Sequence, residues 1–450
     1  MSLGMFDSFI TGHWFDDPAK QLWSDGAQLQ AWLDVESSLA AVQAELGLIP
    51  PAAAATIARC ADARHFDLAA LSREIAFAQH PLTPVLHRFE ALCGEPAAGF
   101  LHWGATTQNI FDTATALLMQ RTHRLLADHL VAAIQAIGQL ALRHSDTPMA
   151  GRTHGQQALP ISLGYKLAGW IDELARDRAR LDERLAPSFP AAMGGAIGTY
   201  AALGAHGPEV ERRLAQRLGL QAGGLPMRSS FDRGADYLHG LGLLAASAQR
   251  IAQDVVFLQR SEVGEMSEAF HDGKVGSSTM AHKRNPSTAL LLVSLSRLLR
   301  SRMPLALEAM VRADEGDSSS TNVTDTLLPE IAVLAVSVAA QLRRLAEGLV
   351  VHAAAMRRNL DLTRGLIVSE AVMMRLAPLL GRHEAHRVLY DAARQVLDDG
   401  HSLLEAVSAH PALGGRALPD GLAEALDPAA YLGLSAELTR ATVGRVLGPG

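Results

Sequence analysis

The chain has 450 residues, 48% hydrophobic and 19% charged, so it can bury large cores and exceeds the usual size of one domain. A formal net charge of −7, no continuous run of about 18 apolar residues and only two cysteines argue against nucleic-acid binding, a membrane span and a structural zinc site. The N-terminus lacks a basic segment followed by an apolar one, which predicts no secretory signal and a cytoplasmic location.

Helix-forming residues dominate the chain and alternating β-branched runs are scarce, which predicts an all-α fold. Apolar positions recur at three- and four-residue spacing in five segments, so we expect helices longer than the globular mean of about 12 residues. These helices are predicted at about residues 110–142, 160–185, 234–266, 287–312 and 327–358. Long helices need long partners, so an elongated bundle is expected, with apolar faces that associate several subunits.

Hydroxyl and amide side chains gather just before the first long helix. Asn109, followed three residues later by Asp112, is similar to a capping box, and the helix N-terminus beyond it offers unpaired amides. Thr106, Thr107 and Gln108 are therefore candidates to hold a substrate carboxylate through hydroxyl, amide and backbone donors. The alternative is that this segment only caps the helix.

His154 lies in a segment that precedes the second long helix, flanked by Arg152, Thr153 and Gln156. Imidazole is the natural proton relay near neutral pH, and the flanking groups can bind an anion. The segment is therefore a candidate for proton transfer or substrate binding. The alternative is a histidine that merely faces solvent.

Residues 276–286 read Gly-Ser-Ser-Thr-Met-Ala-His-Lys-Arg-Asn-Pro, a glycine-led loop that opens a helix. A serine hydroxyl is too weakly acidic to remove a carbon-bound proton unless donors or positive charge stabilise its alkoxide, which Lys283 and the loop amides can do. Asn285 and Pro286 predict an N-cap and a first helical residue, so the positive helix end would also face this loop. Gly276, without a Cβ, lets the backbone bend tightly.

This run resembles the signature of the fumarase/aspartase (fumarate lyase) superfamily, Gly-Ser-Ser-x-Met-Pro-x-Lys-x-Asn-Pro, with Ala281 at the proline position. Thr-Thr-Gln-Asn at 106–109 is similar to the superfamily's Thr-Ser-x-Asp element, without its carboxylate. Gly-Arg-Thr-His-Gly-Gln at 151–156 matches Gly-Arg-Thr-His-x-Gln. The resemblance covers nearly the whole chain.

Three domains are expected from the breaks in the chain and from this resemblance. They are an N-terminal helical domain at 1–109, a central long-helix bundle that carries the signature loop at 110–355, and a C-terminal helical domain at 356–450.

The resemblance implies a lyase-type mechanism in which Ser277, as alkoxide, exchanges the proton of a carbon that bears a carboxylate. Lys283 and Asn285 would stabilise the resulting dianion, and His154 would bind substrate or position an acid. Further substrate-binding residues implied by the resemblance are Thr106, Thr107, Gln108, Thr153, Gln156, Ser278 and Met280, with His80 near the position of an active-site histidine of adenylosuccinate lyases. It implies a small di- or tricarboxylate substrate, no metal or organic cofactor, and a homotetramer in which three subunits form each site.

Position 290 separates the branches of the superfamily. In fumarate-forming branches, a glutamate seven residues beyond the signature lysine pairs with the histidine that His154 matches, and this chain carries Leu290 at that position. Expelling an amine or hydroxide requires a proton, whereas a carboxylate, whose conjugate acid has a pKa of about 4, barely does. The leucine therefore favours the branch of bacterial 3-carboxy-cis,cis-muconate lactonizing enzymes, which several further segments also resemble.

Two other functions remain open. A fumarate-releasing C–N lyase acting on adenylosuccinate or another N-substituted aspartate is favoured by His80 and His154. A non-catalytic scaffold protein is the third possibility, against which the intact signature residues speak. The acidic and serine-rich tract at 314–324 is expected to be a solvated loop that could border a pocket, and it lacks the tryptophans associated with the cycloisomerase there.

Overall fold

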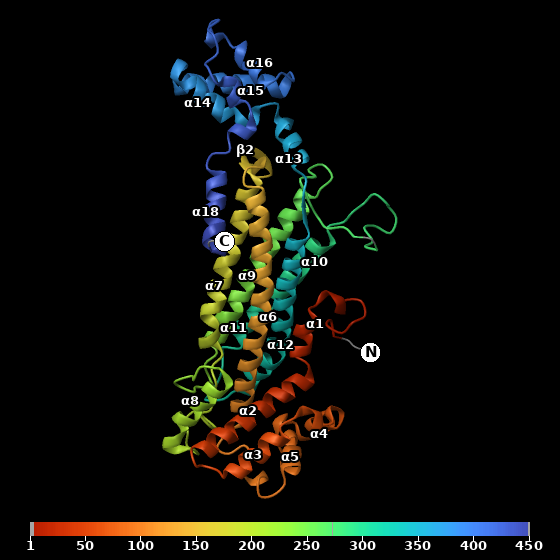
Figure 1. Ribbon diagram of the computed structural model, residues 1–450, viewed down its shortest axis with the longest axis vertical. Helices are drawn as coiled ribbons and strands as arrows, with labels where there is room; N and C mark the ends of the chain where they lie inside the picture. Colours follow the sequence, from red (N-terminus) through yellow and green to blue (C-terminus); the bar gives the residue numbers. More distant parts are fainter. Residues whose placement is uncertain (1–3, 272, 449–450) are drawn as a thin grey trace. The chain divides into compact units, whose positions relative to one another are not determined.

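The computed structural model describes residues 4–271 and 273–448, and its many helices confirm the all-α prediction (Figure 1). Residues 1–3, part of the stretch on which the secretory-signal expectation rests, lie outside the described residues. The chain forms two compact units. Unit 1 comprises Met1–Leu130, Asp177–Gln249 and Val293–Ala340, and unit 2 comprises Val131–Arg176, Arg250–Leu292 and Gln341–Gly450. The expected division into three domains stays a prediction.

Long helices contribute residues to both units, and they fall in the five segments where apolar periodicity predicted them. They are α6 (Thr107–Arg143), α7 (Leu163–Ser188), α9 (Asp232–Leu258), α10 (Ser287–Arg300) and α12 (Ser318–Glu347).

Several boundaries of these helices differ from the prediction. The helix expected over 287–312 ends at Arg300, because Pro304 cannot donate the hydrogen bond that would continue it, and α11 (Met303–Glu308) follows. The helix expected over 327–358 begins at Ser318 and ends at Glu347.

Unit 1 also contains further helices that begin at well-defined caps. The side chains of Asp16, Ser24 and Asp67 accept main-chain N–H groups in the first turns of α1, α2 and α4. The remaining helices of this unit pack around buried apolar side chains such as Leu33, Leu39 and Phe89. The bounds are α1 (Asp17–Leu22), α2 (Asp25–Glu45), α3 (Pro51–Cys60), α4 (Leu68–Ala78), α5 (Leu82–Cys93) and α8 (Gly207–Leu218).

Unit 2 contains two small antiparallel sheets that the sequence did not predict. The first pairs β1 (Pro148–Thr153) with β2 (Gln156–Ser162), and the second pairs β3 (Met266–Glu268) with β4 (Leu349–Val351). Helices α14, α15 and α16 pack together (Figure 1) over a core that includes Leu376, Val388 and Leu403. The bounds of the C-terminal helices are α13 (Ala353–Leu360), α14 (Ser369–Leu380), α15 (Arg382–Asp398), α16 (Leu403–Ser408), α17 (Leu422–Ala425) and α18 (Ser435–Leu447).

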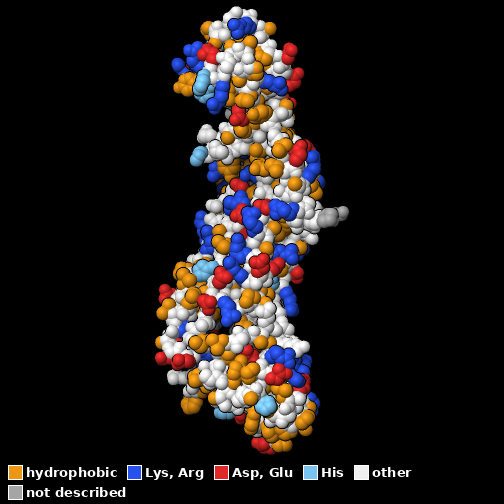
Figure 2. Space-filling model, turned by 90° about the vertical axis from the view of Figure 1, so that its left-hand side faces the viewer, with side chains coloured by type: hydrophobic (Ala, Val, Ile, Leu, Met, Phe, Trp, Pro, Cys, Tyr) orange, Lys and Arg blue, Asp and Glu red, His pale blue; other side chains and the backbone are white. Residues whose placement is uncertain are grey.

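Three of the long helices are apolar enough to cross a membrane by length and composition alone, which corrects the expectation drawn from continuous apolar runs. The 18-residue windows in α6, α9 and α12 are 44%, 56% and 67% buried within the structure. Much of their apolar surface is therefore already used in helix packing. Elsewhere, hydrophobic side chains reach the surface among charged ones (Figure 2).

Candidate active site

The first group of predicted site residues lies at the start of α6, and the helix begins three residues earlier than expected. Asn109 is buried in the first turn, where its Oδ1 accepts the N–H of Thr106 (3.1 Å) and of Gly195 (3.1 Å). Asn109 is therefore not the N-cap. The predicted pairing of Asn109 with Asp112 is also wrong, because the Asp112 carboxylate accepts from Gln108 Nε2 at 2.6 Å.

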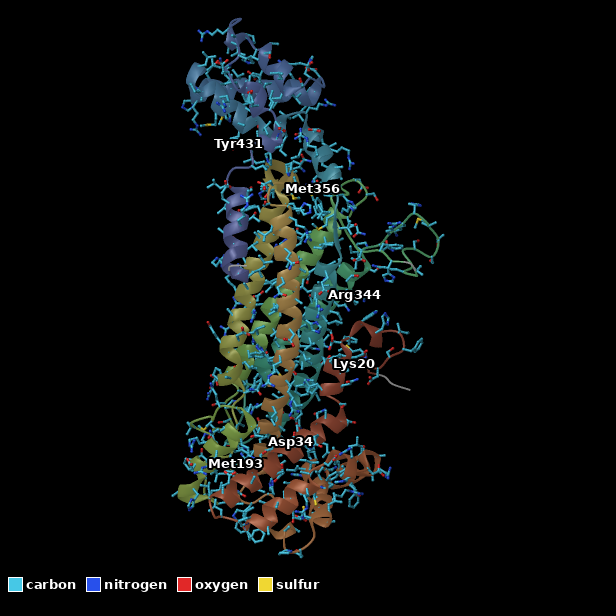
Figure 3. The ribbon with its side chains drawn as sticks, viewed as in Figure 1. Lys20, Asp34, Met193, Arg344, Met356 and Tyr431 are labelled. Atoms are coloured by element: carbon cyan, nitrogen blue, oxygen red, sulfur yellow. The ribbon has the colours of Figure 1, made fainter. Side chains whose placement is uncertain are left out.

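The glycine-rich segment that supplies Gly195 is fixed against the same helix start. Ala192 N–H donates to Thr113 Oγ1 at 3.0 Å, and the N–H of Met193, labelled in Figure 3, donates to Glu211 Oε2 at 3.0 Å. Glu211 lies on α8 and is 2% exposed, and this burial raises its pKa. The side-chain amide of Asn109, which accepts the N–H groups of Thr106 and Gly195, thus connects this glycine-rich segment to the start of α6.

His80 joins this group, because it contacts Thr107. Its Nδ1 accepts the main-chain N–H of Thr83 (3.1 Å), and its Nε2 lies 3.4 Å from Thr107 Oγ1. A neutral ring that accepts at Nδ1 carries its proton on Nε2, the nitrogen that faces Thr107. The structure therefore brings together two residues that lie 27 positions apart in the sequence.

A cavity of about 330 Å³ adjoins Gln108 and includes part of the acidic and serine-rich tract. That tract is not all loop, since α12 begins at Ser318, and it does border a pocket. Arg228 also lines the cavity. Its guanidinium donates to the Ala196 carbonyl, and its buried Nε has no hydrogen-bond partner within the described part of the chain. Sequence reasoning missed Arg228, although a cation in the Gly- and Pro-rich stretch ahead of α9 was a visible signal.

The second group of predicted residues forms the tip of the β1–β2 hairpin, where only a loop was expected. His154 and Gly155 have φ values of 52° and 79°, and two consecutive positive values fit a type I′ turn. Thr153 and Gln156 pair directly below the turn, and the His154 side chain is exposed. The helix expected from about residue 160 begins instead at Leu163.

An ion pair anchors the first strand of this hairpin. Arg152 donates two hydrogen bonds to the fully buried carboxylate of Glu265, at 2.9 and 2.6 Å, and Asn359 Nδ2 adds a third at 2.8 Å. The Arg152 guanidinium also lies 5.3 Å from the centre of the Phe257 ring. Arg152 therefore orients the hairpin and is not directed toward a substrate.

The third group lies on the signature loop, residues 276–286, which directly precedes α10. It is part of the segment between α9 and α10 that is drawn in green in Figure 1. Ser277 Oγ accepts the main-chain N–H groups of Met280 (3.1 Å) and Thr279 (3.4 Å). Two amide donors at one hydroxyl oxygen are the arrangement that would stabilise an alkoxide. Lys283, Ser278 and Met280 are exposed on the same loop.

The predicted role of the helix end behind this loop is wrong. Asn285 does not cap α10, because its Nδ2 donates to the Gly276 carbonyl at 2.7 Å across the base of the loop. The carboxylate of Glu268 accepts the N–H groups of Thr288 (2.9 Å) and Ala289 (3.1 Å) at the start of α10. The positive end of the helix is therefore already occupied.

The predicted residues thus form three groups, one in unit 1 and two in unit 2. Within the residues that the structure describes, no set of three or more His, Cys, Asp or Glu side chains is arranged to hold a metal ion.

Comparison with known proteins defines the class. Residues 15–297 match the family model described as lyase, and residues 365–442 match the model described as adenylosuccinate lyase C-terminus. The chain belongs to the fumarate lyase superfamily and is an enzyme of the lyase and cycloisomerase type, as the signature predicted.

Individual relatives differ in the reactions that their names describe. The N-acetyl-S-(2-succino)cysteine lyase of Enterococcus italicus is 36% identical, over 93% of this chain and 92% of that protein. The 3-carboxy-cis,cis-muconate cycloisomerase of Pseudomonas putida is also 36% identical, over 91% and 97%. The crystal structure of 3-carboxy-cis,cis-muconate lactonizing enzyme from Pseudomonas putida superposes with a TM-score of 0.90 at 33% identity, covering 97% of this chain and 98% of that one.

Proposed function

We propose that the protein is a 3-carboxy-cis,cis-muconate cycloisomerase that forms a lactone in aromatic catabolism. The observation that carries the proposal is Leu290, which lies in the first turn of α10 and is 46% exposed. A leucine at this place supplies no proton and no charge to His154, the residue that matches the partner of the glutamate in the fumarate-forming branches. A reaction whose leaving or adding group is a carboxylate needs neither.

The proposed chemistry centres on Ser277. In the cycloisomerase direction, a carboxylate of the muconate adds across a double bond, and Ser277 delivers its proton to the neighbouring carbon. The serine alkoxide that remains is stabilised by the two loop amides and by Lys283. In the reverse direction the same oxygen removes that proton.

The carboxylates of the substrate would be held mainly by hydroxyl and amide side chains from the other two groups, and also by polar side chains of the signature loop itself. The proposed set is Thr106, Thr107, Gln108, Thr153, Gln156, Ser278 and Asn285, with Met280 and His80 at its edge. We add Arg228, because this residue lines the cavity beside Gln108 and a guanidinium is the preferred partner of a carboxylate.

We propose a homotetramer in which each active site takes its three groups of residues from three subunits. Supporting this, only 44% of the 18-residue apolar window in α6 and 56% of the one in α9 are buried within a single chain. Apolar helix faces of this kind associate with a second copy of the same bundle.

Fumarate release is the second candidate function, and the contact between His80 and Thr107 favours it, since it places an imidazole N–H among the predicted carboxylate ligands. Adenylosuccinate is one substrate of this kind. N-acetyl-S-(2-succino)cysteine is another, because a relative of equal identity is named for it. A scaffold without activity is the third candidate.

The experiment is a parallel ultraviolet assay of the purified protein with 3-carboxy-cis,cis-muconate, adenylosuccinate and N-acetyl-S-(2-succino)cysteine. We expect loss of the muconate chromophore. Fumarate formed from either of the other substrates, without reaction of the muconate, would replace the proposal by the second candidate, and no reaction with any of them would favour the scaffold.

Ser277→Ala is the matched variant for this assay. Its turnover should fall by a factor of at least about 1,000, because the variant lacks the hydroxyl oxygen to which the loop amides of Thr279 and Met280 donate. Its thermal midpoint should stay within about 1 °C of the wild type, because the lost hydrogen bonds lie in an exposed loop.

A further inference from the structure

One buried carboxylate, that of Glu268, connects both ends of the signature loop. Glu268 is the last residue of β3 and its side chain is 4% exposed. At the end of the loop it accepts the N–H groups of Thr288 and Ala289, as described above. At the start of the loop it forms an ion pair with Lys274, whose side chain is 15% exposed.

A second side chain repeats this connection. Gln259, directly after α9, accepts the main-chain N–H of Glu268 at its Oε1 (3.0 Å) and donates from its Nε2 to the carbonyl of Arg284 (3.0 Å). The carboxylate is thereby tied through its own backbone to the last part of the loop. Both contacts are made by uncharged groups and keep their strength in salt.

The strand that carries Glu268 is itself fixed. Glu268 pairs with Leu349 of β4, and Met266 pairs with Val351. Directly before β3, the buried Glu265 is held by Arg152 and Asn359. A carboxylate on a rigid support can define the positions of the flexible groups that it binds.

The charges explain why this arrangement should be stable. A buried carboxylate requires full hydrogen bonding and a countercharge, which the two amides and Lys274 provide together. The helix N-terminus adds a favourable partial positive charge. Loss of Lys274 would remove the countercharge, and loss of Glu268 would leave two helix amides unpaired and the Lys274 ammonium group with only the carbonyl of Ala269.

We propose that Glu268 is a positioning residue that closes the signature loop and thereby holds Ser277 Oγ at its two amide donors. Glu268 does not contact the substrate; it acts through Lys274 and the first turn of α10. The catalytic part of this inference rests on the proposed role of Ser277, whereas the closing of the loop does not.

Three variants separate the two ends of the loop. Glu268→Ala removes both contacts, Lys274→Met removes only the contact at the start, and Glu268→Gln keeps an oxygen that can accept an amide N–H. The matched control is Glu262→Gln, which exchanges an exposed glutamate of the preceding turn. Circular dichroism of each variant establishes that it is folded.

The first measurement needs no substrate. Trypsin should cleave after the exposed Lys283 and Arg284 about 10-fold faster in Glu268→Ala than in the wild type, with Lys274→Met between them. Hydrogen exchange at the Thr288 and Ala289 amides should speed up in Glu268→Ala and stay slow in Lys274→Met. Equal cleavage and exchange in Glu268→Ala, the control and the wild type would overturn the proposal.

The second measurement uses whichever substrate the wild type converts. We expect kcat to fall by about 10- to 100-fold in Glu268→Ala with KM changed much less, because most of the proposed carboxylate ligands lie on other segments. Glu268→Gln should recover part of the loss. A loss confined to KM would contradict the positioning role. If the wild type converts none of the substrates, the proposed function fails, and the cleavage and exchange data still decide whether Glu268 closes the loop.

Discussion

Arg152 and Glu265 form a two-point contact between the β1–β2 hairpin and the segment before β3, with distances of 2.9 and 2.6 Å. Glu265 is fully buried, so its charge depends on this partner. Arg152→Met should lower the free energy of unfolding by about 3–5 kcal/mol, because it leaves a buried carboxylate with only the Asn359 amide. Urea denaturation followed by circular dichroism measures the change.

The control for this prediction removes the orphaned charge as well. The double variant Arg152→Met/Glu265→Gln should lose less stability than Arg152→Met alone. If the free energy of unfolding of Arg152→Met lies within about 1 kcal/mol of the wild-type value, the ion pair contributes as little as exposed pairs do.

Position 276 requires glycine because its backbone passes close to that of Lys283, and not because its φ is positive. A Cβ built on Gly276 would lie 2.4 Å from the carbonyl oxygen of Lys283, across the base of the signature loop. Gly276→Ala must therefore displace the loop, and turnover should fall by about 100-fold while the thermal midpoint changes little. Gly444→Ala, where a Cβ meets nothing within 4 Å, is the matched control and should keep full activity. Unchanged turnover in Gly276→Ala would mean that the loop adapts without cost.

His154 tests the argument about the leaving group. Asn tolerates the positive φ that the type I′ turn requires at this position, so His154→Asn should preserve the hairpin. If a carboxylate adds and leaves, muconate turnover should fall by less than about 10-fold, whereas loss of a required general acid costs about 100- to 10,000-fold. Steady-state kinetics distinguish the two. A 100-fold loss on carboxymuconate would make His154 the proton donor.

His123 should give the fold a pH dependence. Its ring is 8% exposed, with Nδ1 3.0 Å from Tyr237 Oη and Nε2 3.0 Å from Asp182. Burial lowers the pKa of His123 from the usual 6.5, and the charge of Asp182 offsets only part of this. As the pH falls, the unfolded chain therefore takes up a proton at His123 before the folded chain does. The contribution of the neutral His123 to the stability of the fold is thus present above pH 6.5 and is lost as the pH falls below that value.

Thermal unfolding between about pH 7 and pH 5 measures this effect. His123→Gln should flatten the decline of the midpoint with acidification, and His386→Gln, which changes an exposed histidine of α15, should not. Parallel curves for the wild type and His123→Gln would contradict the assignment.

The fold class could be predicted because helical periodicity is a local property of the sequence. The β1–β2 hairpin could not, since its residues include Pro148, Gly151 and Pro160 and few that favour strands. Its stability depends on the turn at His154 and on Glu265, which lies 113 positions away from Arg152. The break after Arg300, by contrast, was readable from Pro304.

The candidate site was predictable where a motif carried it. The signature run identified Ser277, Lys283 and Asn285 as one loop, although the structure gives Asn285 a different hydrogen bond from the one expected. The contacts of His80 with Thr107 and of Glu268 with Thr288 depend on chain segments that meet only in the folded protein. Propensity and spacing carry no information about such pairs.

Three of the hydrogen bonds that close the signature loop join residues within one short stretch of the chain, and they link Gln259 to Arg284, Asn285 to Gly276 and Glu268 to Ala289. A loop that is closed by local contacts can keep its structure while residues elsewhere in the chain mutate. Proteins that descend from one ancestor can then bind different substrate acids and expel different leaving groups while they keep the same proposed serine base.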